Sequence, residues 1–290
     1  MQDLQQRIAV ITGAASGIGL AIAASLARRG ASVAVMDIEH DALHEAAAML
    51  AGTGAPVLPV VVDVSSRASM YEAAATVRDR FGGLDILVNN AGVVHNSTPL
   101  HETPDEAIDW SIDVNVHGVL NGIKAFVPLI IETGRGGHVV NTGSIGGFQV
   151  RKSEHWYQAL YAATKYAVTA LSEGLRMDLE EFGIGVSVLA PSAVSTNIGT
   201  SDRNRPGRFG GPAEGSLNPL VDHMLRQTGV AADVVGERVI QGIIDNEAYI
   251  FTHLDVREWL EVRHRAIEAA FDGTRRFLAG PMNKAGGTGH

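Results

Sequence analysis

The sequence predicts an α/β fold built on a doubly wound parallel sheet, and three observations support that prediction. Short, almost continuously apolar runs recur along the whole chain, and amphipathic stretches with helical spacing separate them. Strands of that character are buried on both faces, as they are when helices cover both sides of a parallel sheet. The 290 residues are 46% hydrophobic, which is enough for one large core. We therefore expect a single domain over residues 1–290.

The expected elements alternate along the chain. Seven apolar runs predict strands, at residues 8–11, 33–36, 57–62, 86–88, 138–141, 186–189 and 249–251. Apolar residues at helical spacing predict the clearest helices, at residues 18–26, 112–130 and 168–182. Glycines stand where helices should end in a left-handed cap, at Gly30, Gly82, Gly134 and Gly183.

Two segments interrupt this alternation. Residues 194–230 form a long insertion, and its part from 201 to 216 is crowded with glycine, proline and arginine. Long irregular loops in compact domains are often functional lids. We expect 201–216 to be a mobile lid that closes over substrate, so that changes in it alter substrate KM more than cofactor affinity. The glycine-rich tail, residues 280–290, is expected to be frayed.

The composition argues against several classes of partner. Lys plus Arg number 23 and Asp plus Glu 32, and a net charge of −9 disfavours nucleic acid and anionic membranes. The chain has no cysteine, which excludes disulfides, thiol nucleophiles and zinc–thiolate sites and suits a reducing cytoplasm. No signal peptide is visible, and no apolar run approaches the roughly 18 residues of a membrane span. We expect a soluble cytoplasmic protein.

A glycine-rich string follows the first predicted strand and opens the first predicted helix, Thr12-Gly13-Ala14-Ala15-Ser16-Gly17-Ile18-Gly19. Glycine permits a positive φ and, without a Cβ, lets backbone amides approach a phosphate closely. The helix N-terminus adds free N–H groups and the positive end of its dipole. Alone, the string also fits an ordinary βα turn. In this position it predicts a site for a dinucleotide pyrophosphate in a Rossmann fold.

An acidic residue points to the kind of dinucleotide. Asp37 ends the second predicted strand, 18 residues after Gly19. A carboxylate there accepts hydrogen bonds from the adenosine ribose hydroxyls and repels a 2′-phosphate. The loop carries Ser16 rather than a base, and Ile38 follows Asp37. The sequence therefore predicts NAD rather than NADP.

A second string, Tyr161-Ala162-Ala163-Thr164-Lys165, carries the expected chemistry. Residues at i and i+4 share one face of a helix, where an ammonium can hold a phenol near its ionised form. By itself this spacing also fits a surface pair. Combined with the glycine string and the strands between them, it predicts a nicotinamide-dependent oxidoreductase of carbonyls and alcohols.

With these motifs in this order, roughly residues 5–255 resemble the short-chain dehydrogenase/reductase family. The matching positions are the glycine string, Asp37, Asp63-Val64, Asn89-Asn90-Ala91-Gly92, Asn115, Ser144, the Tyr161 to Lys165 string and residues 191–196. Residues 245–250 and 255–258 further resemble a subgroup that includes the Cα-dehydrogenases of lignin aryl-ether breakdown. Several ordered matches are far more specific than any one of them.

The resemblance implies a role for each catalytic position. Tyr161 would be the general acid/base, with its pKa lowered by Lys165 and by the cationic nicotinamide. Ser144 would hydrogen-bond the substrate oxygen, and Lys165 would also hold the nicotinamide ribose. Asn115 would help anchor a water that links Lys165 to solvent. Hydride would pass directly between the nicotinamide and the substrate carbon, so no metal is implied.

The resemblance also implies the cofactor contacts. They are Gly13, Ser16, Gly17, Ile18 and Gly19 at the pyrophosphate, Asp37 at the ribose, Asp63 and Val64 at the adenine, Asn90, Ala91 and Gly92 beneath the cofactor, and Val194 and Thr196 at the carboxamide.

Two departures from the family pattern affect the substrate side. Pro191-Ser192 stands where Pro-Gly is common, and 17 positions separate Ser144 from Tyr161, a few more than usual. The added residues, 151–158, should form a rim around the site. This rim includes His155, and the expected pocket residues are Val93, Val94, His95, Ile145, Phe148, Trp156, Tyr157 and Phe209. This aromatic and apolar set predicts a bulky hydrophobic, possibly aryl, secondary alcohol or ketone, with steroid, terpene and cyclic alcohols left open.

Other classes of function share parts of this pattern. A non-catalytic NAD-binding sensor or scaffold need not keep Asn115, Ser144, Tyr161 and Lys165 together, yet all four are present. A lyase, epimerase or dehalogenase on the same fold would alter the Ser/Tyr/Lys set. A 3-oxoacyl thioester reductase usually prefers NADPH, which Asp37 disfavours.

Assembly is expected from two helices. Residues 112–131 and 162–182 carry apolar residues around more of their circumference than one sheet contact covers, namely Ala125, Phe126 and Ile130 on the first and Ala170, Leu171 and Leu175 on the second. The resemblance implies that these helices pair across a two-fold axis. We expect a homotetramer, with a dimer as the alternative.

Overall fold

The computed structural model of the chain describes residues 3–95, 98–151, 156–212 and 219–280. The chain divides into two compact units, Met1–Thr252 and His253–His290. The first unit contains the whole sheet, and the second contains helix α9 (Val256–Ala279). The sequence shows no compositional break at this boundary. The expected rim residue His155, the end of the expected lid (213–216) and residues 281–290 of the tail lie outside the described residues.

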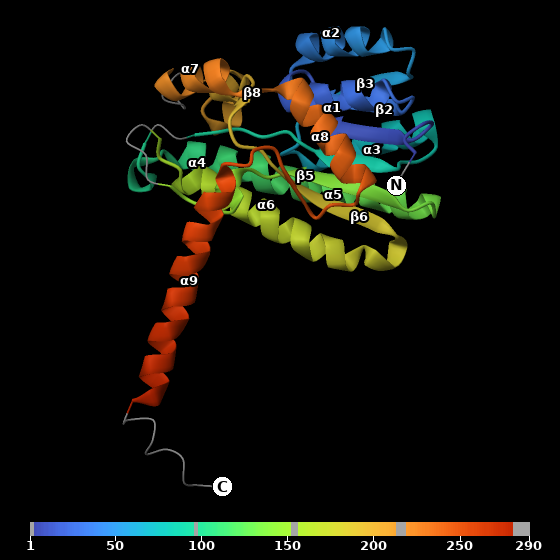
Figure 1. Cartoon of the computed structure of the whole chain (residues 1–290). Coiled ribbons are helices and arrows are strands. Elements are labelled where there is room, and N and C mark those ends of the chain that lie inside the picture. The colour runs from blue at the N-terminus through green and yellow to red at the C-terminus, as the bar shows by residue number, and fades with distance from the viewer. Residues whose placement is uncertain (1–2, 96–97, 152–155, 213–218, 281–290) are drawn as a thin grey trace. The chain divides into compact units, whose positions relative to one another are not determined.

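Seven parallel strands form one sheet in the order β3-β2-β1-β4-β5-β6-β9 (Figure 1). Their bounds are β1 (Ile8–Thr12), β2 (Ser32–Asp37), β3 (Val57–Val61), β4 (Ile86–Asn89), β5 (Gly137–Thr142), β6 (Ile184–Ala190) and β9 (Tyr249–Phe251). All seven predicted strands are confirmed, and the fold is a doubly wound Rossmann-like domain. The strand order reverses between β1 and β4, which opens a crevice beyond the carboxyl ends of the strands. The edge strand β3 contains Pro59, and the other edge strand, β9, has only three residues.

Helices cover both faces of this sheet. The helices described in this unit are α1 (Gly17–Ala27), α2 (His40–Ala51), α3 (Arg67–Phe81), α4 (Asp105–Ile112), α5 (Gly118–Thr133), α6 (Ala159–Asp178), α7 (Pro219–Thr228) and α8 (Ala232–Ile244). Buried residues of α1, α2 and α8 form one core with Ala9 and Ile11 of β1. Val10 faces the opposite core, which α3, α5 and α6 complete. Burial on both faces explains why the strands are apolar at successive positions.

The helix predicted at 112–130 is part of a longer helical stretch with a defect in it. It begins at Asp105 as α4, passes through a π-helical turn at Asp113–His117, and continues as α5 to Thr133. The π-helical turn holds Asn115. Such turns are mostly single insertions within an α-helix, and they are frequent at functional sites.

The same stretch bears on the expectation that no segment approaches the length of a membrane span. Asp105–Thr133 is long and apolar enough to cross a membrane by length and composition alone, and 56% of its most apolar 18-residue window is buried within the fold. Helix α5 packs on the sheet through Phe126 and Ile130, whose side chains are fully buried. The hydropathy of this helix is therefore that of a core helix.

A buried histidine links the last strands of the sheet. His138 on β5 places its Nε2 2.7 Å from Ser187 Oγ, and this hydroxyl donates to the Glu247 carbonyl. Because the Ser187 proton is committed to that carbonyl, the Nε2 atom of His138 must donate to Ser187 Oγ. Burial lowers the pKa of His138 to about 3. The side chain therefore stays neutral at any ordinary pH.

This histidine predicts loss of stability in acid. The pKa of His138 is depressed in the folded state, so its contribution is complete above pH 6.5 and is lost as the pH falls toward 3. At pH 5 the loss should be about 2 kcal/mol. Urea unfolding at pH 7 and pH 5 should show this drop in the unaltered protein and not in His138→Gln. Replacing the exposed His44 with glutamine should leave this drop in the free energy of unfolding unchanged. An equal drop in His138→Gln and in the unaltered protein would refute the assignment to His138.

Candidate active site

The glycine string forms a cradle at the carboxyl end of β1. Gly13 and Gly17 have φ values of +65° and +58°, a region that favours glycine. A Cβ on Gly13 would lie 2.8 Å from the Ala91 Cα, and one on Gly19 would lie 2.2 Å from the Gly13 carbonyl oxygen. The cradle has room for a close approach of backbone to phosphate and none for side chains. It therefore fits the pyrophosphate of a dinucleotide at the N-terminus of α1.

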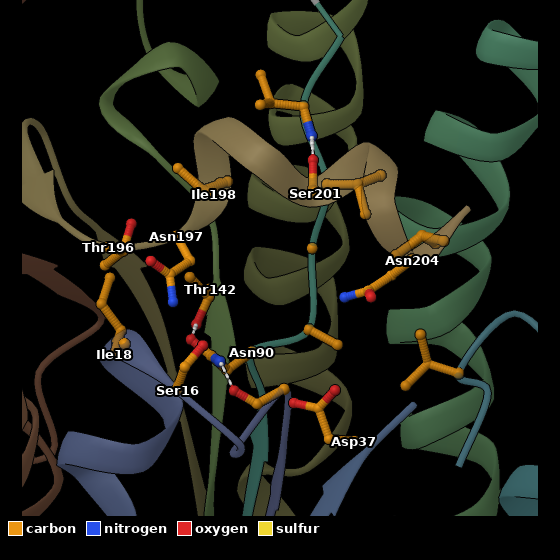
Figure 2. A pocket seen from close by; sticks show the side chains of 18 of the residues that line it. Ser16, Ile18, Asp37, Asn90, Thr142, Thr196, Asn197, Ile198, Ser201 and Asn204 are labelled. Atoms are coloured by element: carbon orange, nitrogen blue, oxygen red, sulfur yellow. Dashed lines mark hydrogen bonds between the residues drawn. The ribbon is translucent and has the colours of Figure 1, made fainter. Parts of the chain in front are cut away.

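Asn90 holds this cradle from the neighbouring strand. Its Nδ2 donates to the carbonyls of Thr12 (3.0 Å) and Gly13 (3.1 Å), and its Oδ1 accepts from Thr142 Oγ1 (3.3 Å). Figure 2 shows Asn90 and Thr142 joined in this way near Ser16, with Thr196 and Asn197 of the insertion nearby. The ends of β1, β4 and β5 are thus tied together beneath the site.

Asp37 lies at the far end of the same cavity, as predicted for a ribose acceptor. Its Oδ2 accepts from the Ala15 amide (3.0 Å) and its Oδ1 from the Glu39 amide (3.2 Å). Burial raises the pKa of this carboxyl, and the two amides oppose the rise. Each carboxylate oxygen has further lone-pair capacity for a ribose hydroxyl.

Asp63 and Val64 line the cavity beside this end. The Asp63 carboxylate is engaged by protein groups, since it accepts from Ser65 and from Arg208 Nη2 (2.6 Å). Burial alone would raise its pKa, but the bonds from Ser65 and Arg208 outweigh burial and hold the pKa below its usual value. Asp63 is therefore an anionic anchor for the insertion as well as an expected adenine contact.

Three of the four predicted catalytic residues lie at the other end of the cavity, where the end of β5 and helix α6 line it, three strands across the sheet from Asp37. Tyr161 and Lys165 lie one turn apart on α6, and the Lys165 Nζ is 5.6 Å from the centre of the Tyr161 ring. Lys165 is 3% exposed and donates to the Thr142 carbonyl (2.8 Å). Ser144 begins the short turn Ile145–Gly147, and its Oγ accepts from the Gly146 amide (3.1 Å). Ser144, Tyr161 and Lys165 all line the cavity.

Burial dominates the electrostatics of this group. Burial raises the pKa of Tyr161 to about 12, and a hydrogen bond with Ser144 opposes the rise. Burial also lowers the pKa of Lys165 to about 8. Lys165 by itself therefore does not give Tyr161 a pKa below its ordinary value. A positive charge brought by a bound ligand would favour the phenolate.

Asn115 has a positioning role in the structure. Its Oδ1 accepts from the Val93 amide (2.8 Å), and its Nδ2 donates to the Val93 carbonyl (2.9 Å) and Thr164 Oγ1 (3.1 Å). The side chain thus joins the π-helical turn to α6 and to the chain after β4. The water path expected at Asn115 stays a prediction.

The cavity brings together most of the predicted site. Its lining includes Gly13, Ser16, Gly17, Ile18, Asp37, Asp63, Val64, Asn90, Ala91, Gly92, Val93, Val94, Ser144, Trp156, Tyr161, Lys165, Val194 and Thr196. Gly19 and Asn115 support that lining from behind, against Gly13 and Val93.

Several expected pocket residues lie elsewhere. Phe148 packs on Tyr249 and Phe251, with ring centres 5.7 and 5.4 Å away, because the turn after Ser144 directs it to the edge strand β9. Ile145 and the exposed Tyr157 are likewise outside the described lining. Phe209 joins Trp110 in a small buried cluster, and His95 bonds Thr98. The described substrate end is instead completed by Ile198 and Leu225 with Trp156.

The described part of the expected lid is folded over the cavity. Ser201 Oγ accepts from the Val94 amide (3.3 Å), a bond drawn in Figure 2, and Phe209 is buried. Arg203 pairs with Glu39 and Arg208 with Asp63, both at the Asp37 end. Two arginines of this segment therefore contact carboxylates at the expected adenosine end, while Ser201 bonds Val94 at the substrate end. The expected effect of changes in 201–216 on substrate KM stays a prediction.

Sequence reasoning did not identify Glu39, Arg203 and Leu225 as residues that line the cavity. Glu39 stands only two positions after Asp37, so its presence beside the ribose site could have been inferred. Arg203 and Leu225 come from the irregular insertion, and no local pattern relates them to β2 or to α6. Their place depends on the tertiary fold.

Comparison with known proteins agrees with this geometry. The family model for short chain dehydrogenase matches residues 7–207. A Cα-dehydrogenase from Sphingobium sp. strain SYK-6 is 36% identical over 269 residues, which cover 92% of this chain and 87% of that protein. A 1-deoxy-11-beta-hydroxypentalenate dehydrogenase from Streptomyces exfoliatus is 37% identical over 255 residues, or 88% and 86% of the two chains.

A solved structure is also similar. The short-chain dehydrogenase/reductase from Burkholderia phymatum in complex with NAD has a TM-score of 0.86 and 32% identity, and the match covers 93% of this chain and 97% of that one. The fold and the cavity thus define an oxidoreductase with a dinucleotide cradle. The chain belongs to the short-chain dehydrogenase family.

Proposed function

We propose that this protein is an NAD-dependent oxidoreductase that interconverts a bulky hydrophobic secondary alcohol and its ketone. The observation that carries the proposal is one cavity with Asp37 at one end and Ser144, Tyr161 and Lys165 at the other. Bound across that cavity, the cofactor would supply the hydride acceptor or donor. The glycine cradle and Asp37 would hold its pyrophosphate and adenosine ribose.

The residues of the chain would handle the proton. Tyr161 would take the hydroxyl proton of the alcohol during oxidation and return it during reduction. Ser144 would hold the substrate oxygen beside Tyr161 by a hydrogen bond. Lys165, buried against Thr142, would add its charge on the cofactor side. Charge from Lys165 and from an oxidised cofactor would together favour the phenolate that burial disfavours.

The substrate end supports a hydrophobic molecule. Val94 and Leu225 form a buried cluster there, against which Trp156, Tyr161 and Ile198 pack. One similar protein is named a Cα-dehydrogenase and the other a dehydrogenase of 1-deoxy-11-beta-hydroxypentalenate, a substrate whose name includes a hydroxyl group. We propose aryl or terpenoid secondary alcohols as the first classes to test, by following NADH absorbance.

Cofactor preference tests the proposal. The unaltered protein should use NAD⁺ at least about tenfold better than NADP⁺ in kcat/KM, equivalent to about 1.4 kcal/mol, because Asp37 repels a 2′-phosphate. Asp37→Ala should narrow that ratio. Steady-state kinetics with both cofactors measures it, and equal use of both by the unaltered protein would contradict NAD dependence.

The alternatives lack a comparable observation. A sensor or scaffold has no need of Ser144, Tyr161 and Lys165 in the dinucleotide cavity. A 3-oxoacyl thioester reductase remains the second choice, and the cofactor ratio separates it because such enzymes usually prefer NADPH. The cytoplasmic location stays a prediction.

Assembly into a homotetramer, or a dimer, is proposed on revised grounds. Ala125, Phe126 and Ile130 are buried within the subunit and cannot form the interface expected of them. Exposed apolar side chains do occur on α6 at Met177 and on α9, at Val262, Ile267, Phe271, Phe277 and Leu278. Light scattering at micromolar concentration should give a multiple of 30.6 kDa, and a mass of 30.6 kDa would refute assembly.

A further inference from the structure

An arginine from the insertion lies beside the expected ribose site. Arg203 Nε donates to Glu39 Oε2 (3.1 Å) and Arg203 Nη2 donates to Glu39 Oε1 (2.5 Å), which makes a two-pronged ion pair. Both residues line the cavity, as Asp37 does. The Glu39 amide also donates to Asp37 Oδ1, so that the two carboxylates share one tight turn after β2. A substituent on the adenosine 2′-oxygen would enter this corner.

The guanidinium is held in place without Glu39. Arg203 Nη1 donates to the Thr200 carbonyl (2.8 Å) and to Thr200 Oγ1 (3.0 Å). Its other edge, formed by Nε and Nη2, faces Glu39. Loss of the Glu39 charge would therefore leave an anchored guanidinium with a free edge.

That free edge has the chemistry of a phosphate ligand. A guanidinium fork fits carboxylate and phosphate oxygens equally well in geometry, and such charge-assisted bonds are among the strongest in proteins. While Glu39 occupies the fork, the positive charge of Arg203 is cancelled within the pair. A 2′-phosphate that entered this corner would then meet only the negative charge of Asp37.

We propose that Glu39 determines cofactor selectivity by occupying Arg203, which is otherwise a ligand for the 2′-phosphate of NADP(H). This inference rests on the proposed NAD dependence and adds a second determinant to Asp37. It differs from simple repulsion in one respect: the effect of Glu39 on NADPH depends on the presence of Arg203.

The test is a double-mutant cycle read by binding. Glu39→Gln, Arg203→Ala and the double variant are titrated with NADH and NADPH by fluorescence at fixed ionic strength, without substrate. Glu39→Gln should tighten NADPH binding at least about tenfold, as expected for freeing a charge-assisted ligand, and change the NADH Kd by less than about threefold. In the Arg203→Ala background the same change should shift the NADPH Kd by less than about threefold.

A group of three charged surface residues provides the matched control. Glu237 accepts from Arg28 and Arg29 between α1 and α8, outside the cavity, and Glu237→Gln should leave both Kd values unchanged. Equal tightening of NADPH with and without Arg203 would overturn the proposal, because repulsion alone would explain it. No tightening in either background would also overturn it. Equal NADH and NADPH affinity in the unaltered protein would instead count against NAD dependence, and the cycle would still report on the Arg203–Glu39 pair.

Discussion

Replacing Tyr161 with phenylalanine is expected to lower turnover by at least about a hundredfold, the usual contribution of general acid/base catalysis. The substitution removes only the hydroxyl, and the ring keeps its packing against the buried Val94 and Leu225 cluster. NADH affinity should therefore stay within about threefold, since the lost group acts on the reacting proton rather than on binding. Steady-state turnover and NADH titration of the variant together show whether catalysis is lost while cofactor binding is kept. Near-full turnover in Tyr161→Phe would show that another group moves the proton.

The pH dependence of alcohol oxidation provides a second test of Tyr161. The pKa of Tyr161 is about 12 before a cofactor is bound, above its ordinary value, so the phenolate fraction grows throughout the range from pH 6 to 10. Alcohol oxidation should rise over this range in the unaltered protein and lose that rise in Tyr161→Phe. Tyr71→Phe on α3, where the side chain is exposed, should keep the profile. A flat profile in the unaltered protein would contradict the phenolate as base.

The second large effect is expected at the cradle. An alanine at Gly19 would place its Cβ 2.2 Å from the Gly13 carbonyl oxygen and 2.6 Å from Asn90 Nδ2. Both neighbours belong to the bonded group that shapes the cradle, so the loop must move. Overpacking of this kind costs about 1–3 kcal/mol, and we expect NADH affinity to fall at least about tenfold with a lower Tm.

Gly174 on the exposed surface of α6 is the matched control. Apart from its chain neighbours and its own helix backbone, no atom of the described residues lies within 4 Å of its Cβ position. Gly174→Ala should therefore leave NADH binding unchanged and add up to about 1 kcal/mol of helix stability. If Gly19→Ala bound NADH as tightly as Gly174→Ala does, the cradle would not hold the cofactor in the way proposed.

Local patterns in the sequence predicted the parts of the site that local structure builds. The strands were visible because both faces of the sheet are covered, which leaves apolar runs with few interruptions. Gly13, Asp37 and Tyr161 were visible because each occupies a fixed place relative to a strand end or a helix turn. For these residues, the spacing along the chain largely determines the position in space.

The remaining features depend on contacts between distant segments. The pairing of Arg203 with Glu39 joins positions that no periodicity connects. Phe148 looked like a pocket residue because it follows Ser144, but the direction of the turn takes it to Phe251. The pKa of Tyr161 depends on burial as much as on the neighbouring lysine, and burial can only be assessed once the cavity exists.

The two ends of the main sheet have a consequence for how copies of this chain can associate. A sheet grows when a new strand pairs with the free N–H and C=O groups of an edge strand. At one edge, Pro59 in the middle of β3 has no N–H to offer. At the other, β9 ends after three residues, so an added strand would find few partners there. Both borders thus resist the ribbon-like stacking that leads to aggregation, and ordered association is left to the helices.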